Sequence, residues 1–200
     1  MAQNKLPFLL SSVNEPPIAD PQLDELIRWG RLFDELGLAP SYGTGSHGNL
    51  SIRSKRGCLI SATQTFLGTI EPSHFVEIIG CDERTAPPTI LCRGALRPST
   101  DSLIHWHLYQ WRPETACVLH AHDPLTLAAA DQLDIPQTER PADAGSPDLV
   151  ELIRPLAQHS YFLVREHGFV AQAKTINEAG ELALAVHRRA QQLIEEEEKL

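Results

Sequence analysis

Apolar side chains recur at helical spacing in the segment that follows Asp20. Asp20 is a suitable N-cap, Pro21 suits the first helical position, and Gly37 supplies a stop signal. These signals predict one amphipathic helix. Its apolar positions are Leu23, Leu26, Ile27, Phe33 and Leu36.

Shorter segments downstream alternate in the manner of strands, and helical patterns separate some of them. The predicted strands cover 49–53, 58–61, 75–79, 115–122, 161–165 and 169–171. The predicted helices cover 99–112, 124–130 and 147–157, and a last helix begins at the capping box of Thr175 and Glu178. Strands and helices in this order predict an α/β domain with one sheet covered by helices.

The first 19 residues differ from the rest of the chain. Pro7, Pro16 and Pro17 predict an irregular arm with little regular structure. A chain of 200 residues has room for one compact domain, so we assign residues 20–200 to it.

The charge balance narrows the choice of ligands. Seventeen Lys and Arg stand against 26 Asp and Glu, which gives a net charge of −9. This balance disfavours sequence-independent binding of nucleic acid. An anionic ligand would have to be held by a local arrangement of hydrogen-bond donors.

Cysteine spacing and hydropathy bear on location. The chain has four cysteines and no C-x-x-C pair, which argues against a zinc ribbon and against a disulfide-dense secreted scaffold. The apolar stretch 6–13 is a poor signal peptide, and no apolar run reaches the roughly 20 residues of a membrane span. We expect a soluble protein of the cytoplasm with no membrane partner.

The strongest chemical signal is the sequence His120-Ala121-His122. Residues i and i+2 of a strand point to the same face, so both imidazoles could converge on a metal ion. A pair of structural histidines at a strand end is the alternative. His167, at the end of another predicted strand and before Gly168, adds a third imidazole. Three histidines leave a zinc site with an open position, as in catalytic centres.

A second cluster is Arg97-Pro98-Ser99-Thr100-Asp101, at the start of the helix that precedes these histidines. Hydroxyls and free backbone N–H groups there could bind an anion, or Ser99 or Thr100 could simply cap the helix. Asp101 could complement the helix dipole, bind the metal or act as a base, and His105, four residues on, could pair with it.

A third cluster is the glycine-rich loop 43–49. Such a loop can cradle a phosphate, but this one matches neither a P-loop nor a dinucleotide fingerprint, and it could be an ordinary turn. His47 within it could face solvent or contact a ligand.

Taken in order, these motifs resemble the class II aldolase/adducin family over residues 22–190. The resemblance rests on Gly48-Asn49-Leu50-Ser51-Ile52-Arg53, on Arg97-Pro98-Ser99-Thr100-Asp101 followed by His105 and Tyr109, on His120-Ala121-His122 and on His167-Gly168. It implies a three-layer α/β/α single domain with a central sheet, and a cyclic homotetramer with active sites at subunit interfaces.

The resemblance also implies roles for particular residues. His120, His122 and His167 fall where the family binds one Zn²⁺ per chain, and Asp101 falls where fuculose-phosphate-type aldolases carry a glutamate base. The family's positions for the substrate phosphate correspond to Gly48, Asn49, Thr63, Ser99 and Thr100.

The implied activity is that of a zinc-dependent lyase cleaving a carbon–carbon bond in a small phosphorylated ketose or related hydroxy-carbonyl compound through an enediolate. A sugar-phosphate epimerase or dehydratase on the same site, and a non-enzymatic adducin-like binding module, are the alternatives. Asp101 is one methylene shorter than the aldolase glutamate, Gln64 replaces a small residue, and loop 134–147 is short. The family's usual tyrosine acid has no evident counterpart, since Tyr161 is the last tyrosine.

Overall fold

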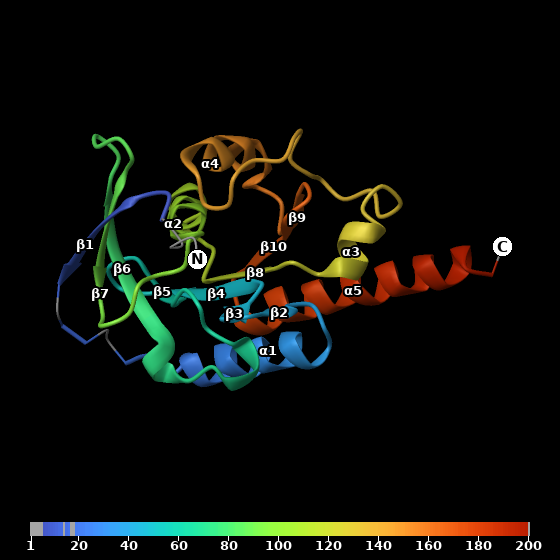
Figure 1. Cartoon of the computed structure of the whole chain (residues 1–200), viewed down its shortest axis with the longest axis horizontal. Coiled ribbons are helices and arrows are strands. Elements are labelled where there is room, and N and C mark those ends of the chain that lie inside the picture. Colours follow the sequence, from blue (N-terminus) through green and yellow to red (C-terminus); the bar gives the residue numbers. More distant parts are fainter. Residues whose placement is uncertain (1–5, 14, 17–18, 200) are drawn as a thin grey trace.

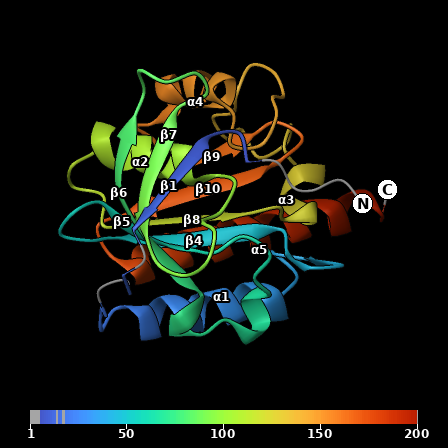
Figure 2. The same cartoon turned by 60° about the vertical axis from the view of Figure 1, so that its left-hand side comes forward.

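The computed structural model describes residues 6–13, 15–16 and 19–199. An eight-stranded sheet runs through it in the order β1-β7-β6-β5-β4-β8-β10-β9 (Figures 1 and 2). The strands are β1 (Leu9–Val13), β4 (Gly48–Arg53), β5 (Cys58–Ser61), β6 (Phe75–Asp82), β7 (Thr89–Arg93), β8 (Cys117–Ala121), β9 (Tyr161–Val164) and β10 (Gly168–Ala173). Each neighbouring pair is antiparallel except β1 and β7.

Helices cover both faces of this sheet, which confirms the predicted three-layer architecture (Figure 1). One face packs on α1 (Leu23–Glu35) and α5 (Ile176–Glu197), and the other on α2 (Ser102–Trp111) and α4 (Pro147–Ile153). A short helix, α3 (Pro124–Ala128), lies beside α5. Two hydrophobic cores result, one on each face.

Close packing of α1 on α5 depends on a glycine. A Cβ built on Gly180 would lie 2.3 Å from the Trp29 ring, so a side chain there would displace the indole. Trp29 also donates a hydrogen bond from Nε1 to Asn177 Oδ1 at 2.9 Å. This helix pair covers the sheet beneath β4 and β8, the strands that carry much of the candidate site.

Sequence reasoning located most elements and misjudged some boundaries. The predicted helix at 20–37 begins at Leu23, with Asp20 Oδ1 accepting a hydrogen bond from the Gln22 N–H. The capping box of Thr175 and Glu178 is confirmed. The short strands β2 (Ser41–Tyr42) and β3 (Gly45–Ser46) and the longer β7 were not predicted.

The prediction of an irregular N-terminal arm is wrong for residues 9–13. They form β1, which pairs in parallel with β7, while Leu6 and Phe8 are buried in the core shared with α2 and α4. Prolines flank this strand and do not interrupt it, so its backbone can join the sheet edge. Residues 1–5, 14 and 17–18 of the arm lie outside the described part. No described helix combines the length and hydrophobicity required to cross a membrane.

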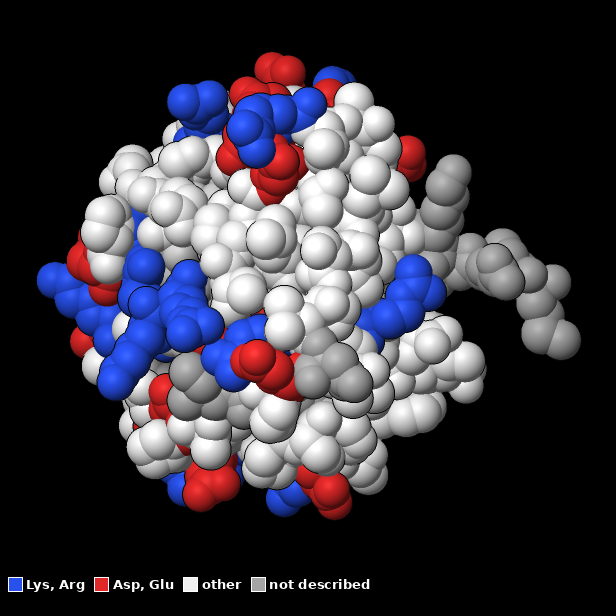
Figure 3. All heavy atoms as spheres, turned by 90° about the vertical axis from the view of Figure 1, so that its left-hand side faces the viewer, with Lys and Arg blue, Asp and Glu red and all other residues white. Residues whose placement is uncertain are grey.

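The surface beyond the β1 edge of the sheet carries both signs of charge. In Figure 3, which faces this side of the molecule, Lys and Arg side chains gather at the left and also lie at the top, right and bottom, with Asp and Glu side chains among them. Within this edge, Arg93 of β7 pairs with Glu15 at 2.8 Å. The excess of acidic residues therefore does not give this face a uniform negative charge.

Candidate metal centre

Three imidazoles converge at one end of β8 and β10. His120 lies on β8, His122 follows that strand, and His167 lies in the β9–β10 turn, where β10 pairs antiparallel with β8. One nitrogen from each ring can be chosen so that all three lie within 4.8 Å of one another. The Nε2 atoms of His120 and His122 are 3.1 Å apart. Their convergence confirms the expected cluster, although His167 precedes β10 in a turn and does not end a strand.

The hydrogen bonds around these rings suit a metal ligand set. His120 Nδ1 donates to the Phe169 carbonyl at 2.7 Å, which leaves the Nε2 lone pair facing the other two imidazoles. His167 Nδ1 is buried and has no hydrogen-bond partner among the described residues. Three neutral imidazoles with one side open form the donor set of catalytic zinc sites, so these residues fit a Zn²⁺ ion.

Burial keeps two of these histidines, His122 and His167, in the form that binds metal. It lowers the pKa of His122 below its usual value, and the neighbouring imidazoles of His120, His167 and His47 lower it further. Burial and His120 lower the pKa of His167 to about 4, although Asp101 opposes the shift. At neutral pH the His122 and His167 rings therefore present lone pairs rather than positive charge.

Asp101 lies beside the three imidazoles. It is the N-cap of α2, yet its carboxylate does not cap the helix. Its Oδ2 accepts a hydrogen bond from Asn49 Nδ2 at 2.7 Å and lies 3.7 Å from His120 Nε2. Burial alone would raise the pKa of Asp101, but His120, His167 and the Asn49 amide hold it below its ordinary value. Asp101 Oδ1 has no partner among the described residues, so it is free to receive a proton.

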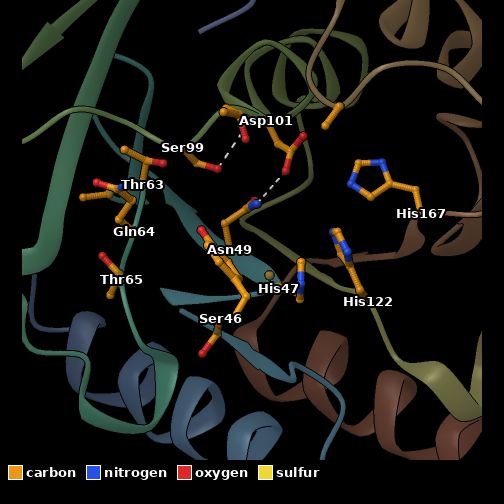
Figure 4. A pocket seen from close by; sticks show the side chains of 15 residues that line it. Ser46, His47, Asn49, Thr63, Gln64, Thr65, Ser99, Asp101, His122 and His167 are labelled. Carbon is orange, nitrogen blue, oxygen red and sulfur yellow. Dashed lines mark hydrogen bonds between the residues drawn. The ribbon is translucent and has the colours of Figure 1, made fainter. Parts of the chain in front are cut away.

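A cavity of about 330 Å³ opens beside this cluster (Figure 4). Figure 4 shows Asn49 between two groups, with Thr63 and Ser99 on one side and His122 and His167 on the other. The cavity is lined by all the residues proposed for phosphate binding and catalysis and by two of the three histidines. These are Gly48, Asn49, Thr63, Ser99, Thr100, Asp101, His122 and His167. His120 is the buried member of the cluster, with 2% of its surface exposed.

Local backbone structure explains how Gly48 and Asp101 are placed at the cavity. A Cβ on Gly48 would lie 2.7 Å from the His120 carbonyl oxygen, so glycine permits the close approach of β4 to β8. Ser99 and Thr100 precede α2 and do not begin it, because the helix starts at Ser102. Ser99 Oγ accepts a hydrogen bond from the Asp101 N–H, which holds Asp101 in place.

The expected pairing of His105 with Asp101 is wrong. His105 Nδ1 instead lies 2.7 Å from Ser51 Oγ, which is also 2.8 Å from the Tyr109 hydroxyl. Ser51 lies on β4 and faces α2, so the sheet provides the partner that helical spacing alone could not reveal. Burial, with a contribution from His120, lowers the pKa of His105 to about 3.

Sequence reasoning missed several lining residues. His47 and Gln64 were noted without a firm role, and both line the cavity. Ser46 was noted only as part of the glycine-rich loop, and the residues not singled out are Tyr42, Ala62, Thr65 and Ala144. They come from short strands and loops whose alternation is too brief to detect, so only the folded chain brings them to the site.

Comparison with known proteins places these features in a wider group. The family model described as the Class II Aldolase and Adducin N-terminal domain matches residues 24–194. A 5-methylthioribulose-1-phosphate/5-deoxyribulose-1-phosphate aldolase of Rhodospirillum rubrum is 28% identical over 183 residues, covering 84% of this chain and 77% of that protein. A methylthioribulose-1-phosphate dehydratase of Pseudoalteromonas translucida is 29% identical over 100 residues, half of this chain and 42% of that protein.

Solved structures share the fold. An L-fuculose 1-phosphate aldolase superimposes with a TM-score of 0.72 at 21% identity, over 90% of this chain and 89% of that one. The L-fuculose-1-phosphate aldolase of Thermus thermophilus gives a TM-score of 0.68 at 18% identity, over 87% of this chain and 93% of that one.

Proposed function

The chain belongs to the class II aldolase and adducin family, and we propose that it is a zinc-dependent lyase that cleaves a carbon–carbon bond in a small phosphorylated ketose. One observation carries the proposal: three convergent imidazoles lie beside a buried, partly unpaired carboxylate and share a cavity with hydroxyl and amide groups. An inert scaffold has no need of that arrangement.

His120, His122 and His167 would hold the metal. A divalent ion bound there supplies Lewis acidity toward the carbonyl and hydroxyl oxygens of a substrate. The bond from His120 Nδ1 to the Phe169 carbonyl fixes the orientation of that ring and the tautomer that binds metal. Imidazole suits several transition metals, so the preference for zinc rests on the donor set and is part of the proposal.

Asp101 would act as the base and acid of the reaction. Its lowered pKa keeps the carboxylate ionised at neutral pH, and Oδ1 has no other described partner to compete for a proton. Asn49 fixes the carboxylate through Oδ2, so Oδ1 is the atom that would take a proton from substrate and return it.

The substrate phosphate would bind at the hydroxyl-lined side of the cavity. Gly48, Asn49, Thr63, Ser99 and Thr100 are the proposed contacts. No Lys or Arg is among the cavity's described lining residues, so hydrogen bonds rather than ion pairs would hold the phosphate. Fixing the phosphate converts remote binding energy into orientation at the reacting carbon.

The names of the two relatives indicate dehydration as a second candidate reaction. One similar protein is named an aldolase and the other a dehydratase, and both names specify 5-methylthioribulose 1-phosphate. Dehydration begins with removal of a proton from the carbon next to the carbonyl. Retro-aldol cleavage ends with return of a proton to that same carbon of the enediolate, so one carboxylate could serve either reaction. Coverage favours the aldolase, because that match extends over 84% of this chain and the dehydratase match over half. Neither of these two relatives is named an epimerase or an adducin.

We further propose a cytoplasmic homotetramer in which residues 20–200, together with the strand Leu9–Val13 that joins their sheet, act as one domain. The four cysteines are all unpaired thiols in the structure, which suits a reducing compartment. The tetramer follows from the family alone, and sedimentation of the purified protein would test it.

A retro-aldol assay tests the proposed activity. Zinc-loaded protein is incubated with 5-methylthioribulose 1-phosphate, 5-deoxyribulose 1-phosphate and ribulose 1-phosphate. We expect dihydroxyacetone phosphate and an aldehyde from at least one of them. Formation of a dehydrated or epimerised product without aldehyde would contradict the lyase proposal and identify the protein as a dehydratase or an epimerase.

A further inference from the structure

Three aromatic rings lie in succession from the glycine-rich loop to the metal centre. The His47 ring stacks on His122, with centroids 4.9 Å apart and planes inclined by 26°. The other neighbour of His47 is Tyr42, at 4.6 Å and 42°. All three residues line the cavity. We call Tyr42 and His47 the ring wall.

Backbone hydrogen bonds hold the ring wall in place. The His47 N–H donates to the Pro40 carbonyl at 2.9 Å, and the His47 carbonyl accepts from the His122 N–H at 3.1 Å. Tyr42 lies on β2, which pairs with β3 immediately before His47. The wall is thus joined directly to a proposed metal ligand, so its distance from the reacting carbon is set by the main chain.

The ring wall lies on the metal side of the cavity, away from the proposed phosphate contacts. Figure 4 shows His47 next to His122, with Asn49 separating both from Thr63 and Ser99. A ketose with its phosphate at the hydroxyl side and its carbonyl at the histidines would extend its remaining carbons toward the rings. His47 is solvent-exposed and lines the cavity between Tyr42 and His122, so the edge of its ring can contact a ligand.

We propose that Tyr42 and His47 determine specificity by contacting the end of the ketose farthest from its phosphate, and that they favour an apolar or thioether terminus over a hydroxyl. This inference rests on the proposed lyase function. Ring edges make favourable contacts with sulfur and with methyl groups, and a terminal hydroxyl gains no such contact.

The test uses aldol condensation, in which the wall's contribution can be compared between two aldehydes. Dihydroxyacetone phosphate loses a proton from its hydroxymethyl carbon, that carbon bonds to the aldehyde carbon, and the aldehyde oxygen gains a proton. Methylthioacetaldehyde and glycolaldehyde differ only in the terminal group that would face the wall. We measure the ratio of kcat/KM for the two aldehydes in zinc-loaded wild type, His47→Ser, His47→Phe and Tyr42→Ser.

The expected result is a fall in the methylthio-to-hydroxyl ratio of about three- to tenfold in His47→Ser and Tyr42→Ser. His47→Phe keeps the ring without its nitrogens and should retain most of the preference. The exposed His159→Ser serves as the matched control, with an unchanged ratio. An unchanged ratio in both serine variants would overturn the proposal, and so would a His47→Phe that behaves like His47→Ser.

Two further measurements separate this inference from the lyase assignment. The first is exchange of the dihydroxyacetone phosphate proton with deuterium, which reports proton removal in the absence of an aldehyde. If His47→Ser lost exchange to the same extent as it lost condensation, the substitution would have impaired proton removal itself, which would contradict a role in aldehyde specificity. The affinities of 5-deoxyribulose 1-phosphate and ribulose 1-phosphate are also measured by calorimetry in Asp101→Asn protein. If wild type shows no lyase activity, a preference for the deoxy compound that His47→Ser abolishes still supports the ring wall, and its absence refutes it.

Discussion

The two ends of β4 carry polar clusters that differ in how many of their buried polar atoms have hydrogen-bond partners. At the end near Arg53, the guanidinium donates to three backbone carbonyls, those of Thr115 at 2.8 Å, Tyr109 at 2.9 Å and Arg112 at 3.0 Å. At the end near Asn49, three buried atoms lack described partners: Asn49 Oδ1, Asp101 Oδ1 and His167 Nδ1. In the Arg53 cluster, one buried atom lacks a described partner, Arg112 Nη1.

Unpaired buried atoms are thus more numerous at the Asn49 end, and the residues that carry them line the cavity. Buried polar groups are costly when unpaired, so a paired cluster stabilises the fold and an unpaired one indicates a missing partner. Helix α2 joins both clusters, because Asp101 is its N-cap and the carbonyls of Tyr109 and Arg112 lie in and just after its last turn. We therefore expect the Asn49 end to govern activity and the Arg53 end to govern stability.

The largest effect is expected from the metal ligands. His120→Ala removes a ligand and should lower kcat/KM at least about a thousandfold, because Lewis acidity contributes several kcal/mol to the transition state. Bound zinc, measured by mass spectrometry, should fall in parallel. Full zinc content and full activity in this variant would show that the site is assigned wrongly.

Replacement of the carboxylate comes next. Asp101→Asn keeps the shape of the side chain and the three imidazoles, so zinc content should hold while kcat falls about a hundred- to ten-thousandfold. Steady-state kinetics at saturating metal measures this loss. Activity within a few-fold of wild type would exclude Asp101 as the base.

The opposite end of β4 should respond in stability rather than in catalysis. Arg53→Met removes the guanidinium donor from the carbonyls of Thr115 and Tyr109 and leaves that of Arg112 with the Thr115 N–H alone. It should lower the free energy of unfolding by about 2–4 kcal/mol. Urea denaturation measures this change, and kcat per folded molecule should stay close to wild type. Lys55→Met, at an exposed position of the following turn, is the control and should change stability by less than about 0.5 kcal/mol.

His105 lies between these two ends, and its protonation should make the free energy of unfolding depend on pH. The folded pKa of His105 is about 3, below the value near 6.5 of an unfolded histidine. Between these values the unfolded chain binds the additional proton, so stability decreases as pH falls from about 6.5 toward 3.

Urea titrations of metal-free protein at several pH values measure that slope. His105→Asn should reduce it by up to about 1.4 kcal/mol per pH unit, the contribution of one proton. An identical slope in variant and wild type would mean that His105 does not remain neutral when folded.

The sequence predicted the parts of the fold that depend on local signals. The capping box of Thr175 and Glu178, the stop at Gly37 and strand β5 were located from short patterns of residue type. The strand Leu9–Val13 was missed because its neighbour β7 is distant in the sequence and its flanking prolines suggested a loop. Pairing between distant segments leaves little trace in local composition.

In the candidate site too, local sequence patterns predicted some features, and contacts between distant segments were missed. The convergence of His120 and His122 follows from strand geometry, and His167 joined them through the pairing of β10 with β8. The partner of His105 could not be predicted, because Ser51 reaches it from another strand. Tyr42 gave no signal, since two-residue strands have no detectable period.

The most direct test of the central claim is the metal content of protein purified without a histidine tag and dialysed extensively, expressed as moles of each transition metal per chain. The account predicts about one zinc per chain, held by His120, His122 and His167. Protein that contains no metal and also fails to bind added zinc would contradict it, and the three histidines would then be packing residues.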